Sequence, residues 1–197
     1  ASKGTGMLHR SRKLFDNLFA YIWSGHGNNA HSYLFPNVLR GERPHVIVDP
    51  GFVVNETYED CLNSLIDAMA ADGFKLEDIG LIINTHTHPD HCQATETIVE
   101  RSTRTDGKGK INKAIVAMHK EADDYYKVAG ERMFSMFGMK VVKLDPLIYL
   151  AEGDLKQNIE VPGKDEVGLL LAAMKRMVEK LQSVVGDIQT TAEGVAM

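Results

Sequence analysis

The feature that most constrains this chain is a continuously apolar run, residues 79–84, that ends directly in a cluster of histidines. A run of this length without polar alternation is typical of a strand that is covered on both faces, as in a parallel sheet. The segment that follows, residues 85–91, reads Thr-His-Thr-His-Pro-Asp-His. The sequence therefore predicts a buried strand whose end carries several metal-binding side chains.

Four side chains of the cluster are metal-ligand types, because imidazole and carboxylate groups bind zinc and iron without thiolates. They are His86, His88, Asp90 and His91. In an extended segment, residues two apart point to the same side, so His86 and His88 are expected to bind one cation together. Pro89 then changes the chain direction, so that Asp90, which we expect to cap the following helix, and His91 face the opposite side of the pocket. Two cations about 3.5 to 4 Å apart would activate a shared hydroxide, which predicts hydrolysis.

The segments around the cluster alternate between strand and helix patterns, which predicts an α/β fold. Two aromatic-rich strands, residues 17–23 and 31–36, are expected to form an opening hairpin. Residues 45–49 form an apolar run that predicts a buried strand delivering Asp49 to the tight turn Pro50-Gly51. We also expect helices at residues 56–71, 93–101, 121–128 and 165–181, and strands at residues 114–118, 140–144 and 158–161.

Composition indicates a globular protein, with 44% hydrophobic and 25% charged residues. No apolar run approaches the roughly 20 residues that span a bilayer, so no membrane partner is expected. The net charge of -5 argues against a general nucleic-acid surface. The only two cysteines, Cys61 and Cys92, cannot form a disulfide framework, and a reducing cytoplasm is the expected compartment.

The length of 197 residues fits one domain, which we expect to span residues 7–188. Residues 1–6 are expected to be a small polar leader outside the fold, and residues 189–197 a loosely held tail.

The pattern His-x-His-x-Asp-His at positions 86, 88, 90 and 91, placed after an apolar strand, resembles the signature of the metallo-β-lactamase superfamily. Two further stretches agree with it. Asn28-Asn29 ahead of Ser32 resembles an early Asn-containing strand of that family, and residues 46–51 resemble its strand ending in Asp-x-Gly. The resemblance covers residues 17–161 and implies a four-layer αββα sandwich.

The resemblance also implies roles for the site residues. His86 and His88 would bind a first metal and Asp90 and His91 a second, while Asp49 would be hydrogen-bonded within the site and orient the ligands. We expect Asp90 to act in catalysis as well. The implied cofactor is zinc, as one or two ions, with iron or manganese as alternatives. The implied activity is hydrolysis of a small-molecule thioester, ester, lactam or phosphodiester by a metal-activated water.

The later part of the chain departs from the family pattern. Members usually supply a third histidine from a Pro-Gly-His segment, a bridging aspartate and a last histidine, but here residues 162–164 read Pro-Gly-Lys. We therefore expect a shortened second half of the sandwich, with a homodimer as one way to cover the exposed sheet. His119 as a substitute ligand is an alternative to a surface or capping role, and Cys92 is expected to be a small buried side chain.

Two other functions stay open for such an incomplete ligand set. One is a metal-binding protein with little or no catalysis. The other is an iron-dependent enzyme resembling the persulfide dioxygenases of the same superfamily.

Overall fold

The structure is a computed structural model, and it describes residues 7–150. Within this range, one seven-stranded sheet has the order β1-β2-β3-β4-β5-β8-β9, and β6 and β7 form a separate pair. The strands are β1 (His9–Phe15), β2 (Leu18–Trp23), β3 (Ser32–Phe35), β4 (His45–Val48), β5 (Ile79–Asn84), β6 (Arg104–Thr105), β7 (Ile111–Asn112), β8 (Ile115–His119) and β9 (Ile148–Leu150). The helices are α1 (Cys61–Ala71), the short 3-10 helix η1 (Leu76–Asp78), α2 (Pro89–Cys92), α3 (Thr95–Ser102) and α4 (Lys120–Met136). The predicted α/β class is confirmed.

The first four strands form the antiparallel part of the sheet. The expected opening hairpin is present as β2 and β3, with Phe19 opposite Leu34. Strand β1 was not predicted, because every residue after His9 in this strand is exposed and leaves no apolar alternation to detect. The sheet therefore begins one strand earlier than the sequence pattern indicates.

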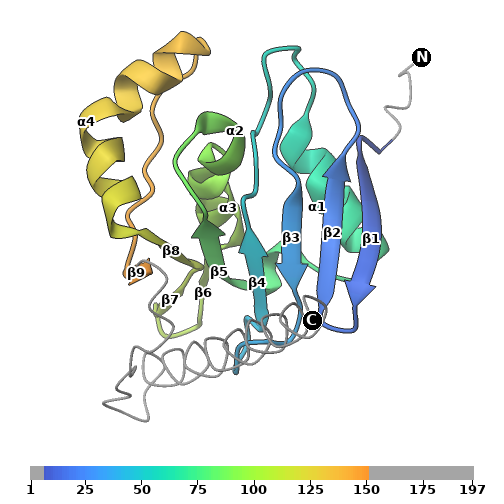
Figure 1. The fold of residues 1–197 in the computed structure, drawn as a ribbon. Coiled ribbons are helices and arrows are strands. Elements are labelled where there is room, and N and C mark those ends of the chain that lie inside the picture. The colour runs from blue at the N-terminus through green and yellow to red at the C-terminus, as the bar shows by residue number, and fades with distance from the viewer. Residues whose placement is uncertain (1–6, 151–197) are drawn as a thin grey trace, which may run out of the picture.

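Strands β4, β5, β8 and β9 run parallel to one another. Val46 pairs with Leu81, and Ile82 pairs with Val116. Parallel strands end at the same edge of a sheet, so the residues that follow β4 and β5 lie next to each other in space. At this edge the chain passes from β5 into α2 (Figure 1), and the histidine cluster belongs to this segment.

The predicted strand at residues 140–144 is wrong. These residues belong to no strand, and the sheet instead adds β9 beyond β8. The physical reason is a side-chain contact: the Tyr126 hydroxyl donates to the Val142 carbonyl at 2.9 Å and accepts from the Val142 N–H at 3.3 Å. Leu144 is buried in the cluster that includes Tyr126 and Phe134, so its apolar character reflects packing under α4.

Helix α1 begins at Cys61, five positions after the predicted start at Glu56. Asp60 caps it, with its Oδ1 accepting the Asn63 N–H at 3.1 Å. The preceding segment is held as a loop because the side-chain oxygen of Asn55 accepts the N–H groups of Thr57 and Glu59. Residues of this kind compete with helical bonding through their own side chains.

Helix α4 is longer than the predicted residues 121–128 and continues through Gly130 to Met136. A glycine in a helix is tolerated where a neighbouring group packs against the backbone. A Cβ added at Gly130 would lie 3.0 Å from ring atoms of Tyr126. The predicted helix at residues 93–101 is present as α3, and the short α2 precedes it.

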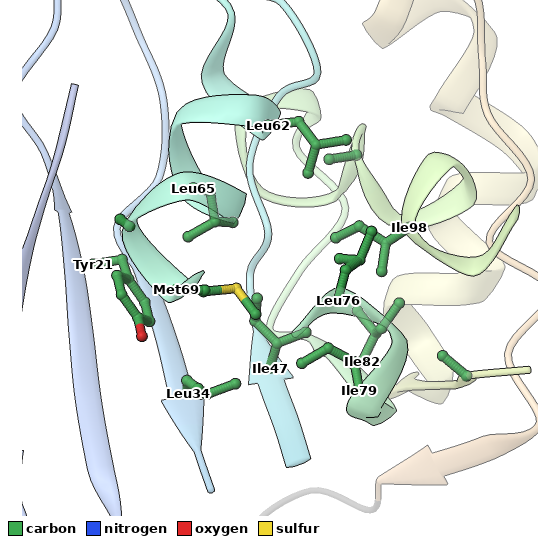
Figure 2. Close-up of a cluster of buried hydrophobic side chains, with 13 residues drawn as sticks. Tyr21, Leu34, Ile47, Leu62, Leu65, Met69, Leu76, Ile79, Ile82 and Ile98 are labelled. Atoms are coloured by element: carbon green, nitrogen blue, oxygen red, sulfur yellow. The ribbon is translucent and has the colours of Figure 1, made fainter. Parts of the chain in front are cut away.

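The central strands β4 and β5 are buried on both faces, which explains their continuously apolar sequences. On one face, Figure 2 shows Ile47 and Ile82 of the sheet with Leu65 and Met69 of α1, in a cluster that also includes Ile98 of α3. The alternate residues Val46, Leu81 and Ala117 point to the other face, where Leu39 of the loop before β4 joins them in a buried cluster. The strand and helix predicted at residues 158–161 and 165–181 lie outside the described residues.

Candidate metal centre

The predicted ligands follow the carboxyl end of β5, where the chain passes from a strand into α2. His88 is the residue before the helix, with an extended backbone, and Pro89 occupies the first helical turn. Proline suits this position because its fixed φ is helical and its missing N–H would have no partner there. The helix therefore begins before Asp90. The expectation that Asp90 caps the helix is wrong, because Asp90 lies inside the first turn.

His86 and His88 point toward each other, as the two-residue spacing predicts. Nε2 of His86 lies 3.1 Å from Nδ1 of His88, and their ring centroids are 4.7 Å apart. Two nitrogens that bind one tetrahedral zinc at about 2.0 to 2.1 Å are separated by roughly 3.3 to 3.4 Å. The observed separation fits a shared cation with a small outward shift of the rings.

Asp90 and His91 form a second pair beside the first. Oδ2 of Asp90 lies 3.6 Å from Nε2 of His91. The ring centroids of His86 and His91 are 4.0 Å apart, so the two pairs are neighbours. The structure thus brings the four predicted side chains together at one edge of the sheet, and three imidazoles with one carboxylate suit a divalent transition metal.

Asp49 lies beneath this cluster, at the end of β4, with its backbone in the left-handed region at a φ of 49°. Its carboxylate is buried and accepts three hydrogen bonds. Oδ1 accepts the Thr85 N–H at 2.8 Å, and Oδ2 accepts the Thr85 hydroxyl at 2.6 Å and Nδ1 of His91 at 3.0 Å. Because Nδ1 of His91 carries the donated proton, its Nε2 lone pair is left for a cation.

Potential ligand atoms of Asp49, His86 and His91 all lie within 4.8 Å of one another. The three donors to Asp49 occupy most of its acceptor positions, however, which argues that it orients ligands. This is the hydrogen-bonded position that the sequence resemblance implies for Asp49.

The two imidazoles nearest Asp49 respond differently to their surroundings. The hydrogen bond that Nδ1 of His91 donates to the Asp49 carboxylate raises the pKa of His91 above its ordinary value, and the negative charges of Asp49 and Asp90 add to the effect. Burial lowers the pKa of His86, and the neighbouring His91 and His88 lower it further. Neutral imidazole is the form that binds metal, so these surroundings favour binding at His86.

Backbone hydrogen bonds fix α2 against two loops. The Ala30 N–H donates to the Asp90 carbonyl, and the Gly51 N–H donates to the His91 carbonyl, both at 3.0 Å. Asn29, part of the Asn-containing stretch, accepts the Phe52 N–H at 2.7 Å. Gly51 has a φ of 81°, and a Cβ there would lie 2.3 Å from the Asn29 side-chain oxygen. The Asp-Pro-Gly turn therefore requires glycine at this position.

The other candidate residues have different roles. His119 precedes α4, and its Nδ1 accepts the Glu121 N–H at 3.2 Å, which is the capping role. Cys92 is buried in the cluster with Tyr126 and Phe134, and burial raises the pKa of its thiol, as expected for a structural cysteine.

The sequence prediction did not include Thr85, which contacts the candidate site. The available signal was a hydroxyl residue directly before the first histidine.

A family model for HAMP domains matches residues 150–183, a short segment that lies almost entirely outside the described residues. No curated protein matches the chain.

Several solved metallo-β-lactamases match its structure. A subclass B3 enzyme of Bradyrhizobium japonicum is 21% identical, with a TM-score of 0.50, over 73% of this chain and 46% of that chain. A β-lactamase from Chitinophaga pinensis is 17% identical, with a TM-score of 0.51, over 73% and 46%. A metallo-β-lactamase from Novosphingobium pentaromativorans is 17% identical, with a TM-score of 0.51, over 77% and 49%.

The fold and the structural comparisons show that this chain has the metallo-β-lactamase fold. They confirm, for the fold, the resemblance that the sequence indicated. The chain spans less than half the length of these structures. Among residues 7–150, no helix has the length and apolar character needed to cross a membrane.

Proposed function

We propose that this chain is a metal-dependent hydrolase whose site is formed by His86, His88, Asp90 and His91. The observation that carries the proposal is the convergence of two ligand pairs at one sheet edge, with Nε2 of His86 3.1 Å from Nδ1 of His88. These two nitrogens would hold one cation. Oδ2 of Asp90 and Nε2 of His91, 3.6 Å apart, would hold a second.

The chemistry that a bound divalent cation supplies is Lewis acidity toward a carbonyl or phosphoryl oxygen and a lowered pKa for a coordinated water. The protein's own residues supply orientation and proton handling. Asp49 holds His91 through Nδ1. The Asp90 carboxylate would accept a proton from an attacking water. Zinc is the cation we propose, with iron or manganese as alternatives.

For the substrate, we propose a small molecule with a thioester, ester, lactam or phosphodiester bond. The matched structures are named as β-lactamases, which makes a β-lactam the first compound to test. The two cysteines are free and buried, which supports our placing the protein in the reducing cytoplasm.

The test uses the full chain, freed of metal and then titrated with zinc, manganese or ferrous iron. We expect zinc binding by the unsubstituted protein and strongly weakened binding by His88→Asn. His26→Asn is the matched control, because the His26 side chain is 92% exposed and contacts Glu59. Failure of the unsubstituted chain to bind any of the three metals above the level of a buffer blank would contradict the proposal.

Hydrolysis is measured separately, with nitrocefin, a chromogenic thioester and bis-p-nitrophenyl phosphate. We expect metal-dependent turnover of at least one probe and a loss of about 100-fold or more in Asp90→Asn, which removes a proton acceptor. Metal binding without turnover would instead support the second candidate, a metal-binding protein. That candidate is favoured by one sequence observation, the Pro-Gly-Lys at residues 162–164 where the family has Pro-Gly-His.

A further inference from the structure

The Thr85 hydroxyl lies between the Asp49 carboxylate and the His86 ring. Its Oγ1 is 2.6 Å from Oδ2 of Asp49 and 3.0 Å from Nδ1 of His86. The Thr85 backbone N–H also donates to Oδ1 of Asp49 at 2.8 Å. Thr85 is therefore bonded to the carboxylate through both its backbone and its side chain, and this two-point contact fixes the position of the hydroxyl.

The direction of these hydrogen bonds follows from the number of protons. A hydroxyl has one proton and accepts through its lone pairs, whereas an ionised carboxylate only accepts. The Thr85 proton therefore goes to Asp49, and the hydroxyl oxygen is left to accept from Nδ1 of His86. The proton of the neutral His86 ring then lies on Nδ1, and Nε2 carries the lone pair.

Nε2 is also the atom of His86 that faces the other ligands, since it lies 3.1 Å from Nδ1 of His88. We infer that Thr85 is a positioning residue that connects Asp49 to His86 and holds the His86 ring in the Nδ1–H tautomer needed for cation binding. This inference rests on the proposed function, because it concerns the cation that the site would hold.

One carboxylate then orients two imidazoles by different routes. Nδ1 of His91 donates directly to Oδ2 of Asp49 at 3.0 Å, whereas His86 reaches the same oxygen through the Thr85 hydroxyl. If Asp49 were instead a direct ligand, the Thr85 hydroxyl would compete with the cation for Oδ2. Removal of the hydroxyl would then strengthen metal binding, so the two arrangements predict opposite effects.

The test compares Thr85→Val, which has nearly the same shape and no hydroxyl, with Thr85→Ser, which keeps the hydroxyl. In the metal-free full chain labelled with ¹⁵N-histidine, NMR reports which ring nitrogen of His86 carries the proton. We expect the Nδ1–H form in the unsubstituted chain and in Thr85→Ser, and a shift toward the Nε2–H form in Thr85→Val. Zinc affinity, measured by competition with a chelating dye, should fall about 10-fold or more in Thr85→Val and recover in Thr85→Ser.

The control is Thr103→Val, which removes a hydroxyl that donates to the Val99 carbonyl at the end of α3. This variant should keep both the His86 tautomer and the zinc affinity. Zinc binding that is equal in the unsubstituted chain and in Thr85→Val, with an unchanged tautomer, would overturn the role of Thr85 alone. Absence of zinc binding by the unsubstituted chain would overturn the proposed function, and with it the role in cation binding that we assign to Thr85.

Discussion

His9 is a buried histidine at the start of β1. Its Nδ1 lies 3.2 Å from the Ser64 hydroxyl, and its Nε2 lies 3.3 Å from the Asn29 side-chain nitrogen. Its ring also makes an edge contact with Trp23. Burial lowers the pKa of His9 from an ordinary value near 6.5 to about 4, with His31 adding to the shift. The folded protein therefore holds this ring in its neutral form.

This pKa has a consequence for stability in weakly acidic solution. Between about pH 6.5 and pH 4, the unfolded chain binds a proton at His9 and the folded chain does not. The free energy of unfolding is therefore highest above pH 6.5 and decreases as the pH falls through this range. We expect this group to contribute a loss of about 1.4 kcal/mol per pH unit, up to roughly 3 kcal/mol. Urea unfolding at pH 7, 6 and 5 should show a shallower dependence in His9→Gln than in the unsubstituted chain.

The matched control for that experiment is His26→Gln, because the His26 side chain is 92% exposed. It should keep the pH dependence of the unsubstituted chain. Equal slopes for His9→Gln and the unsubstituted chain would show that His9 does not carry the effect.

At the scale of the elements, β5 depends on a close contact with the segment before β4. A Cβ added at Gly80 would lie 2.3 Å from the Arg43 carbonyl oxygen and 2.8 Å from a side-chain carbon of Leu39. Arg43 cannot move easily, because its guanidinium donates to the Ile79 carbonyl at 2.9 Å and to the Asn112 side chain at 2.8 Å. The glycine is therefore required by close packing of the backbone.

We expect Gly80→Ala to lower the free energy of unfolding by about 1 to 3 kcal/mol, because the added methyl group must displace backbone. The control is Gly107→Ala, in the connection between β6 and β7, where a Cβ would meet nothing within 4 Å. That variant should stay within about 0.5 kcal/mol. Denaturant midpoints measure both, and equal midpoints for the two variants would contradict the packing argument.

Strands and helices were predictable from the sequence where one local pattern, such as an uninterrupted apolar run, was strong. The buried strand at residues 79–84 coincides with β5, because no polar residue interrupts it before Asn84. The start of α1 was missed because the side chain of Asn55 holds the preceding loop, a contact that no periodicity reveals. Strand β1 was missed because its residues after His9 are exposed and show no apolar alternation. The prediction at residues 140–144 was wrong because their contact with Tyr126 leaves no signal in the local sequence.

In the candidate site, too, some contacts were predictable from the sequence and others were not. The grouping of His86, His88, Asp90 and His91 was predictable because they lie within six consecutive positions and have metal-ligand chemistry. Asp49 was placed by resemblance, whereas the contact of Thr85 with Asp49 depends on the parallel pairing of β4 and β5. Residues this far apart in the sequence meet only once the sheet register is set.

At the scale of the whole molecule, the edge of the described sheet bears on association. Strand β9 pairs with β8 and is the last strand of the sheet within residues 7–150. Its neighbourhood exposes large apolar side chains, with Leu147 68% exposed and Tyr149 44% exposed. Edge strands with apolar side chains tend to associate. These features support the proposal, made first from the sequence, that the chain forms a homodimer.

We expect sedimentation at micromolar concentration to give twice the chain mass of 21.8 kDa. Leu147→Glu should shift the protein toward the monomer, because a charge is costly to bury at an interface. Lys108→Glu, on the turn between β6 and β7, is the charge-change control and should leave the mass unchanged. A monomeric mass for the unsubstituted protein would contradict the proposal.

The hydrogen bonds that connect Asp49 to Thr85 and His91, and Gly51 to Ala94, join the turn after β4 to the segment after β5. A synthetic peptide of residues 79–95 would contain every proposed metal ligand but neither Asp49 nor Gly51. Its imidazoles would have to be ordered at the moment of binding, at the expense of conformational entropy, whereas the folded chain has already restricted them. The chain would thus gain its affinity for a cation when the ends of β4 and β5 come together during folding. The measured affinity would then depend on folding as much as on the chemistry of the ligands.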